Sequence, residues 1–122
     1  MRNEEPKNTD PLKEKSFAFS LRIIKLYQYL IHTHKEYILS KQLLRSGTAI
    51  GALIREAKYA QSKADFLHKL AIALKEANET DYWLELLYKS NYLDSKMYQS
   101  IQPDIHTLLS LLIASTKTVK EQ

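Results

Sequence analysis

The chain has no cysteine, only two glycines and only three prolines among its 122 residues. Without cysteine, a disulfide framework, a zinc–thiolate centre and a cysteine nucleophile are all excluded. Scarce glycine and proline argue against a loop-rich β fold, whose turns need both residue types. No apolar run reaches the roughly 18 residues that a membrane-spanning helix requires. The first ten residues are polar and lack the apolar core of a signal peptide, so we expect a cytoplasmic protein.

Positive charge is concentrated in one part of the sequence. The formal net charge is +4, but residues 11–75 carry +8, whereas residues 1–10 carry −1 and residues 76–122 carry −3. Such asymmetry is typical of a cationic region that meets an anionic partner such as nucleic acid. Lysines on ordinary solvated helix surfaces would give the same composition, so both interpretations stay open at this point.

Hydrophobic periodicity predicts a single all-α domain over residues 11–119, preceded by a disordered segment at residues 1–10. Four helices are expected, over about residues 11–34, 37–59, 62–90 and from 94 or 95 onward, the last interrupted or kinked at Pro103. Short connections between four helices favour an antiparallel, up-down-up-down four-helix bundle.

Both glycines lie inside the second predicted helix, four residues apart. Each costs roughly 1 kcal/mol relative to alanine in a helix, because glycine loses more backbone freedom on folding. At this spacing Gly47 and Gly51 share one helix face, where they would let a second helix approach closely. We interpret them as helix-packing residues, in the bundle or between subunits.

Two apolar surfaces exceed what a monomeric bundle would bury. The apolar residues of the first helix cover more than half of its circumference, so we expect that helix to be buried on two sides. The third helix carries a second stripe of Ile72, Trp83 and Leu86, about 160–220° around the helix from Leu70. Aligned exposed apolar residues around a tryptophan are typical of an interface, so these three are predicted to form a homo-oligomer interface.

The sequence offers no catalytic or metal site. His32 and His34 would point about 200° apart on a helix, which does not suit a shared metal ion. Glu76 and Glu79 face the second stripe and are expected to pair with basic residues across a subunit boundary. Asp81 falls on the predicted core face and needs a structural partner from a neighbouring helix. We therefore expect no enzyme activity, no cofactor and no metal.

Basic residues supply the remaining candidate site. They lie on the polar sides of the first two helices and at the start of the third, interleaved with Tyr29 and Tyr59, which could stack on unpaired bases. The predicted nucleic-acid-binding residues are Arg22, Lys25, Arg45, Arg55, Lys58 and Lys63.

Two blocks of sequence resemble a known family. Residues 42–57, QLLRSGTAIGALIREA, and residues 62–87, SKADFLHKLAIALKEANETDYWLELL, are similar to the four helix bundle protein family, also called the 23S ribosomal RNA intervening-sequence protein or S23 family. The resemblance implies a bundle that assembles as a ring, commonly a pentamer. Some members are encoded within intervening sequences of the 23S ribosomal RNA gene. This sequence has apolar Ala49 and Leu53 where serine and asparagine are frequent.

A related branch of the family is the accessory variability protein of diversity-generating retroelements, a basic pentamer that binds a reverse transcriptase and nucleic acid. Two functional hypotheses follow. The first is a non-enzymatic homo-oligomer that associates with RNA through a basic surface on the first two helices. The alternative is a protein–protein interaction scaffold with incidental surface charge, whose partner could be a reverse transcriptase or another protein. Neither hypothesis involves a membrane.

Overall fold

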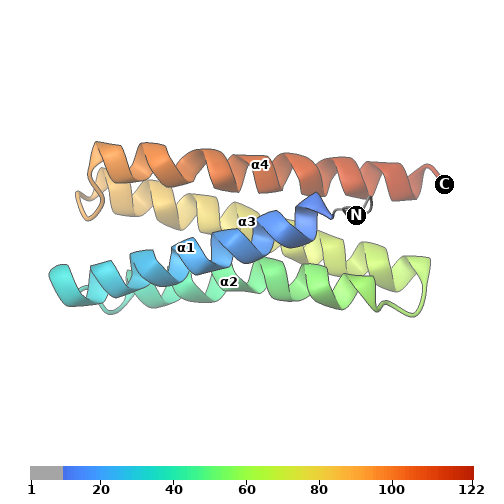
Figure 1. Ribbon diagram of the computed structural model, residues 1–122, viewed down its shortest axis with the longest axis horizontal. Helices are drawn as coiled ribbons and strands as arrows, with labels where there is room; N and C mark the ends of the chain where they lie inside the picture. The colour runs from blue at the N-terminus through green and yellow to red at the C-terminus, as the bar shows by residue number, and fades with distance from the viewer. Residues whose placement is uncertain (1–9) are drawn as a thin grey trace, which may run out of the picture.

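A computed structural model describes residues 10–122, in which four helices account for most of the chain. The helices are α1 (Pro11–Thr33), α2 (Leu39–Lys58), α3 (Lys63–Lys89) and α4 (Ser95–Lys120). They lie side by side in one bundle, with the start of α1 and the end of α4 at the same end (Figure 1). The predicted all-α, four-helix fold is confirmed. The disorder predicted for residues 1–10 lies outside the described residues, apart from Asp10, which caps α1.

The helix starts follow from local polar residues. Asp10, Ser62 and Asp94 each accept a hydrogen bond from a backbone N–H in the first turn of the helix that follows, which satisfies one of its otherwise unpaired donors. With both glycines inside a helix, the turns use other residues: Lys35 and Asn91 adopt positive φ angles of 55° and 71°. Short turns thus connect long helices without glycine.

Of the two alternatives predicted at Pro103, a break between two helices is wrong, because α4 runs through Pro103 as one helix. Proline lacks the N–H that would bond the carbonyl four residues earlier, here that of Gln99. Both residues are exposed, so water can reach that carbonyl and the helix can continue.

The α1–α2 crossing is close, and the two glycines lie on it. An ideal Cβ built on Gly47 would stand 2.9 Å from both γ carbons of Ile23 in α1, and one on Gly51 would stand 3.4 Å from the carbonyl oxygen of Ser16. In Figure 1, α1 starts near α4 and diverges from it toward α2 along its length. Accordingly, α1 packs extensively against α2 and much less against α4. The α1–α4 side of the bundle is therefore more open.

The core face of α3 lies to one side of the predicted one. Helical periodicity predicts a core face of Phe66, Leu70, Leu74, Ala77, Leu84 and Tyr88. The buried residues are instead Leu70, Ala73, Ala77, Thr80, Leu84 and Leu87, and Phe66, Leu74 and Tyr88 are only partly buried. The core is thus centred about 45° around the helix from Leu70, toward the side that carries Trp83. The prediction omits Ala73 and Thr80, whose small and polar side chains carry little hydrophobic signal, and this omission explains the shift.

That shift changes the environment of the second stripe. Ile72, Trp83 and Leu86 are half-buried within one chain, and Trp83 packs against the core. The expectation that a monomer would leave these three residues exposed is therefore wrong. The exposed apolar residues of α1 form a stripe instead: Phe17 is 55% exposed, Leu21 49% and Ile24 38%. We call these three residues the α1 stripe.

Candidate nucleic-acid interface

The six predicted nucleic-acid-binding residues do not form one surface. Three of them are held in ion pairs within the chain: Arg22 with Asp104, Lys58 with Asp10, and Arg45 with two glutamates of α3. The other three, Lys25, Arg55 and Lys63, are exposed and make no ion pair in residues 10–122.

The positive charge of Lys58 is neutralised by its ion pair with Asp10. The Nζ of Lys58 lies 2.8 Å from Oδ2 of Asp10, which ties the start of α1 to the end of α2. The hydrogen bond and charge of Lys58 lower the pKa of Asp10, and the same contact raises the pKa of Lys58. A cation engaged in this way is less available to a phosphate.

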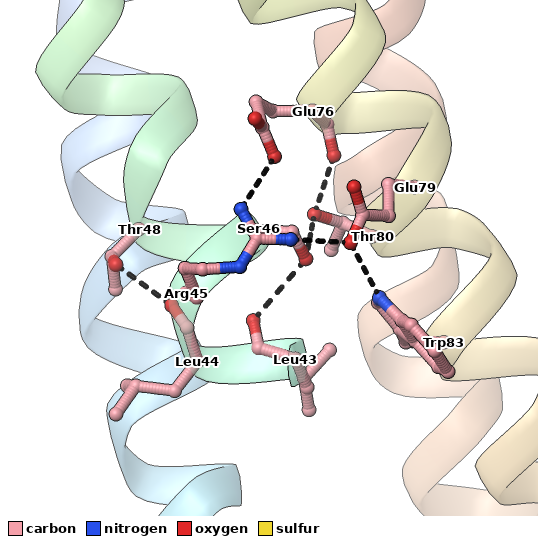
Figure 2. Close-up of polar contacts among 9 residues, drawn as sticks. All are labelled: Leu43, Leu44, Arg45, Ser46, Thr48, Glu76, Glu79, Thr80 and Trp83. Carbon is pink, nitrogen blue, oxygen red and sulfur yellow. Dashed lines mark hydrogen bonds and ion pairs between the residues drawn. The ribbon is translucent and has the colours of Figure 1, made fainter. Parts of the chain in front are cut away.

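Arg45 also contacts its own chain, and Figure 2 shows its partners. Its guanidinium Nη2 lies 2.6 Å from Oε2 of Glu79, and Nη1 lies 3.5 Å from Oε1 of Glu76. The same Glu79 oxygen accepts a 3.0 Å hydrogen bond from the indole Nε1 of Trp83. Beneath this group, the buried hydroxyls of Ser46 and Thr80 lie 3.0 Å apart across the α2–α3 interface. The two glutamates therefore pair within the chain, which corrects the predicted pairing across a subunit boundary.

Asp81 lies at the edge of the α3–α4 interface rather than in the core. Its side chain is partly exposed, and its Oδ2 lies 3.5 Å from Nε2 of His106 in α4. Nearby, Tyr98 stacks on Tyr88 with ring centroids 4.4 Å apart. Burial, together with the negative charges of Asp81 and Glu85, raises the pKa of the Tyr98 hydroxyl. These contacts stabilise the α3–α4 pairing.

Cations gather at a cleft between α1 and α4, where the two helices diverge. The cleft has a volume of about 410 Å³. Its apolar residues are Leu26, Tyr29, Met97 and Ile101, and its polar residues are Arg22, Lys25, Lys96 and Ser100. Two of the predicted residues, Arg22 and Lys25, are thus brought together, but with Lys96 of α4 rather than with residues of α2.

The charge of this α1–α4 cleft is not balanced locally. Arg22 donates to Oδ2 of Asp104 at 2.7 Å, to the carbonyl of Ser100 at 3.0 Å and to the Ser100 hydroxyl at 2.6 Å, so its charge is largely neutralised. Lys25 and Lys96 have no such partner in the described residues. Lys96 also lies in the first turn of α4, where the helix dipole is positive, and the carboxylate of the N-cap residue Asp94 accepts a hydrogen bond from the backbone N–H of Met97. Two ammonium groups therefore concentrate positive potential beside an apolar floor.

Lys96 was missed by the sequence reasoning. A lysine in the first turn of a helix is electrostatically unfavourable, and that placement is a signal that the sequence alone carries. Its proximity to Lys25 could not be inferred, because the crossing of α1 sets it.

A second hollow, the α1–α2 groove, lies along the glycine crossing on the other side of α1. It has a volume of about 820 Å³, and Phe17, Ile24 and Tyr59 line it above a floor of small residues. Its three cations, Lys13, Arg55 and Lys69, are accompanied by Glu56 and Asp65, and Nζ of Lys69 lies 3.0 Å from Oε1 of Glu56. The groove is thus closer to charge balance than the α1–α4 cleft, whose lining includes no acidic residue.

Within residues 10–122, no three His, Asp or Glu side chains are grouped closely enough to hold a metal ion. None of the four helices combines the length and the apolar composition needed to cross a lipid bilayer, in the part of the chain that the structure describes.

The fold and the site define a small four-helix bundle protein with a cationic cleft between α1 and α4. The family model described as 23S rRNA-intervening sequence protein matches residues 11–114, and the chain belongs to that family. A crystal structure of a protein with unknown function from the S23 ribosomal protein family of Bacteroides thetaiotaomicron VPI-5482 is 55% identical, with a TM-score of 0.86. The match covers 87% of this chain and 98% of that one. No curated protein matches the chain. The family resemblance seen in residues 42–87 is confirmed.

Proposed function

We propose that this chain is a non-enzymatic, homo-oligomeric cytoplasmic protein that associates with RNA. The observation that carries the proposal is the pair of unneutralised lysines, Lys25 and Lys96, beside the apolar floor of the α1–α4 cleft. Phosphate backbones bind where lysine and arginine concentrate, because neutralisation releases condensed counterions. The cationic surface thus combines α1 with α4, rather than α1 with α2. The cleft lining has no carboxylate or histidine that could act as a general base, which supports binding without catalysis.

The proposal includes an up-down-up-down bundle that assembles as a ring, a pentamer by the family resemblance. The helix directions are supported by the short connections and by the ends of α1 and α4 in Figure 1. Assembly is supported by the α1 stripe, since three large apolar side chains exposed along one helix face are typical of an interface. We therefore place the main subunit contact on α1 and not on Ile72, Trp83 and Leu86.

Fluorescence anisotropy with labelled, mixed-sequence single-stranded RNA at several salt concentrations tests RNA association. We expect affinity to fall steeply with salt, and the double substitution Lys25→Ala with Lys96→Ala to reduce the slope of log K against log salt by about 1.4. The matched control is Lys75→Ala with Lys120→Ala, which removes the same charge from exposed sites outside the cleft and should leave the slope almost unchanged. An absence of binding at about 50 mM salt, or binding insensitive to salt, contradicts the proposal.

The α1 stripe also favours a second candidate function, a scaffold that binds a partner protein. Phe17 and Ile24 continue into the α1–α2 groove, and such apolar grooves accept amphipathic helices. A pull-down that recovers one protein, survives nuclease treatment and is lost in Phe17→Ser would favour the scaffold. A pull-down whose recovered material disappears with nuclease would favour RNA association.

A further inference from the structure

We propose that the α1–α4 cleft takes one unstacked nucleotide of single-stranded RNA, with its base on the apolar floor and its phosphate between Lys25 and Lys96. This inference rests on the proposed RNA association and adds the form of RNA that is recognised. A smooth cationic surface would bind any phosphate backbone, duplex or single-stranded. A cationic cleft with an apolar floor instead favours RNA whose bases are free.

The size and lining of the cleft suit a single base. Its volume of about 410 Å³ falls in the lower part of the range of small-molecule sites, about 300–1,000 Å³. Leu26 and Ile101 are buried and form the apolar floor of the cleft. Tyr29 and Met97 are half-buried, so each presents part of its surface to the cleft. In duplex RNA the bases are stacked and paired, and a base could enter only after it was unpaired.

Tyr29 is held in place before any ligand binds. Its hydroxyl lies 3.1 Å from Nε2 of His34, and the two rings meet edge to face with centroids 5.2 Å apart. His34 in turn packs edge to face against Tyr92, with centroids 5.4 Å apart. An aromatic ring fixed in this way loses little conformational entropy when a base contacts it.

Arg22 organises the cleft rather than serving as its main phosphate contact. Its three hydrogen bonds connect α1 to Ser100 and Asp104 of α4. The pairing neutralises Asp104, which would otherwise repel a phosphate close to Lys25. The two lysines have flexible stems and compact charges, which suits a phosphate whose position varies along a single strand.

Competition between single-stranded RNA and the duplex of the same sequence tests the cleft directly. We expect the wild-type chain to favour the single strand by at least about fivefold, since stacking one base contributes about 1 kcal/mol or more. Ser100→Trp places a large side chain in the cleft and should abolish this preference. Ser110→Trp adds the same ring at an exposed α4 site outside the cleft and should retain the preference.

Methionine labelling gives a readout that needs no substitution. The chain has two methionines, Met1 and Met97, so [13C]methyl-methionine spectra contain one signal from the cleft. Single-stranded RNA should shift the Met97 methyl signal, whereas the duplex should not. If the single strand binds but Met97 does not shift, or if duplex and single strand bind equally, the cleft proposal is overturned while RNA association stands. If neither RNA binds, both proposals fail.

Discussion

Gly47 of α2 lies directly against Ile23 of α1, so that a Cβ on Gly47 would stand 2.9 Å from both γ carbons of Ile23. These γ carbons belong to a fully buried, branched side chain that cannot turn away without disturbing the core. Gly51, one turn along, is different: its nearest neighbours are backbone and hydroxyl oxygens of Ser16 and Ser20 at 3.4 Å or more. Of the two glycines, only Gly47 stands where the crossing has no room for a Cβ atom.

We therefore expect Gly47→Ala and Gly51→Ala to have opposite effects. Alanine at position 47 gains about 1 kcal/mol in helix propensity but forces an overpacked core that costs about 1–3 kcal/mol, so the net effect should be destabilising. Alanine at position 51 has room for its Cβ and should stabilise the chain by up to about 1 kcal/mol. Urea unfolding of the two variants measures both values. Two variants of equal stability would show that the crossing does not depend on Gly47.

A double-mutant cycle isolates the contact. Ile23→Ala alone should cost about 2–5 kcal/mol through the cavity that it leaves. In the Ile23→Ala background, Gly47→Ala should no longer destabilise, because the methyl group enters that cavity. A coupling energy of about 1 kcal/mol or more, favouring the double variant, is the expected result.

Glu36 makes the stability of α2 dependent on pH. Its carboxylate accepts hydrogen bonds from the N–H groups of Ile38, Leu39 and Ser40 at 3.2, 3.0 and 2.7 Å. Burial alone would raise its pKa, but these three donors outweigh burial and hold the pKa of Glu36 below its ordinary value of 4.5. Because the pKa is lowered in the folded state, the stabilisation is present above pH 4.5 and is lost as the pH falls through the folded value.

Glu36→Gln should therefore cost about 1–2 kcal/mol at pH 7, since an amide replaces the charged acceptor at the start of a helix. The difference from wild type should shrink below pH 4.5 as the glutamate itself becomes protonated. Urea unfolding between pH 7 and pH 3 provides the comparison. Glu85→Gln, at an exposed site in α3, is the control and should differ little from wild type at any of these pH values. A gap that stays constant across the pH range would show that the charge of Glu36 is not responsible.

Arg45 should contribute to stability and little to RNA binding. It is an exposed partner of Glu76 and Glu79, so Arg45→Ala should cost no more than about 1 kcal/mol, and less at high salt. Its RNA affinity should fall less than that of Lys25→Ala, because the two glutamates already neutralise the guanidinium. Unfolding at two salt concentrations and anisotropy with RNA measure the two effects separately. A larger loss of RNA affinity in Arg45→Ala than in Lys25→Ala would show that the RNA-binding surface lies on α2 rather than at the α1–α4 cleft.

The sequence predicted the helices well because their signals are local. Apolar periodicity places all four helices within a few residues of the observed bounds. Glu36 was missed because it lies outside α2 and caps three N–H groups at once, a pattern without a simple sequence signature. Pro103 misled the prediction because the sequence does not show whether the carbonyl that it leaves unpaired faces solvent.

The candidate site was harder to predict because it depends on pairs of residues distant in sequence. Helical periodicity places Arg22 and Lys25 on a polar side of α1, but not beside Asp104 or Lys96, which are more than 70 positions away. Likewise, Glu76 and Glu79 were assigned to another subunit because nothing in the sequence brings Arg45 to them. Helix angles also put Trp83 outside the core, since they do not reveal that α2 covers that side of α3.

The position of the subunit contact gives a final prediction. If subunits meet through the α1 stripe, Leu21→Lys should bury a charge at the interface and shift the particle toward a 14.2 kDa monomer in light scattering. Trp83→Ala should instead lower the stability of each subunit and leave the oligomer intact, because Trp83 packs against its own core and donates to Glu79. Ala52→Lys adds the same charge to an exposed position of α2 and shows whether the contact extends into the α1–α2 groove. An oligomer that survives Leu21→Lys but dissociates in a folded Trp83→Ala variant would place the interface on α3, as the sequence first indicated.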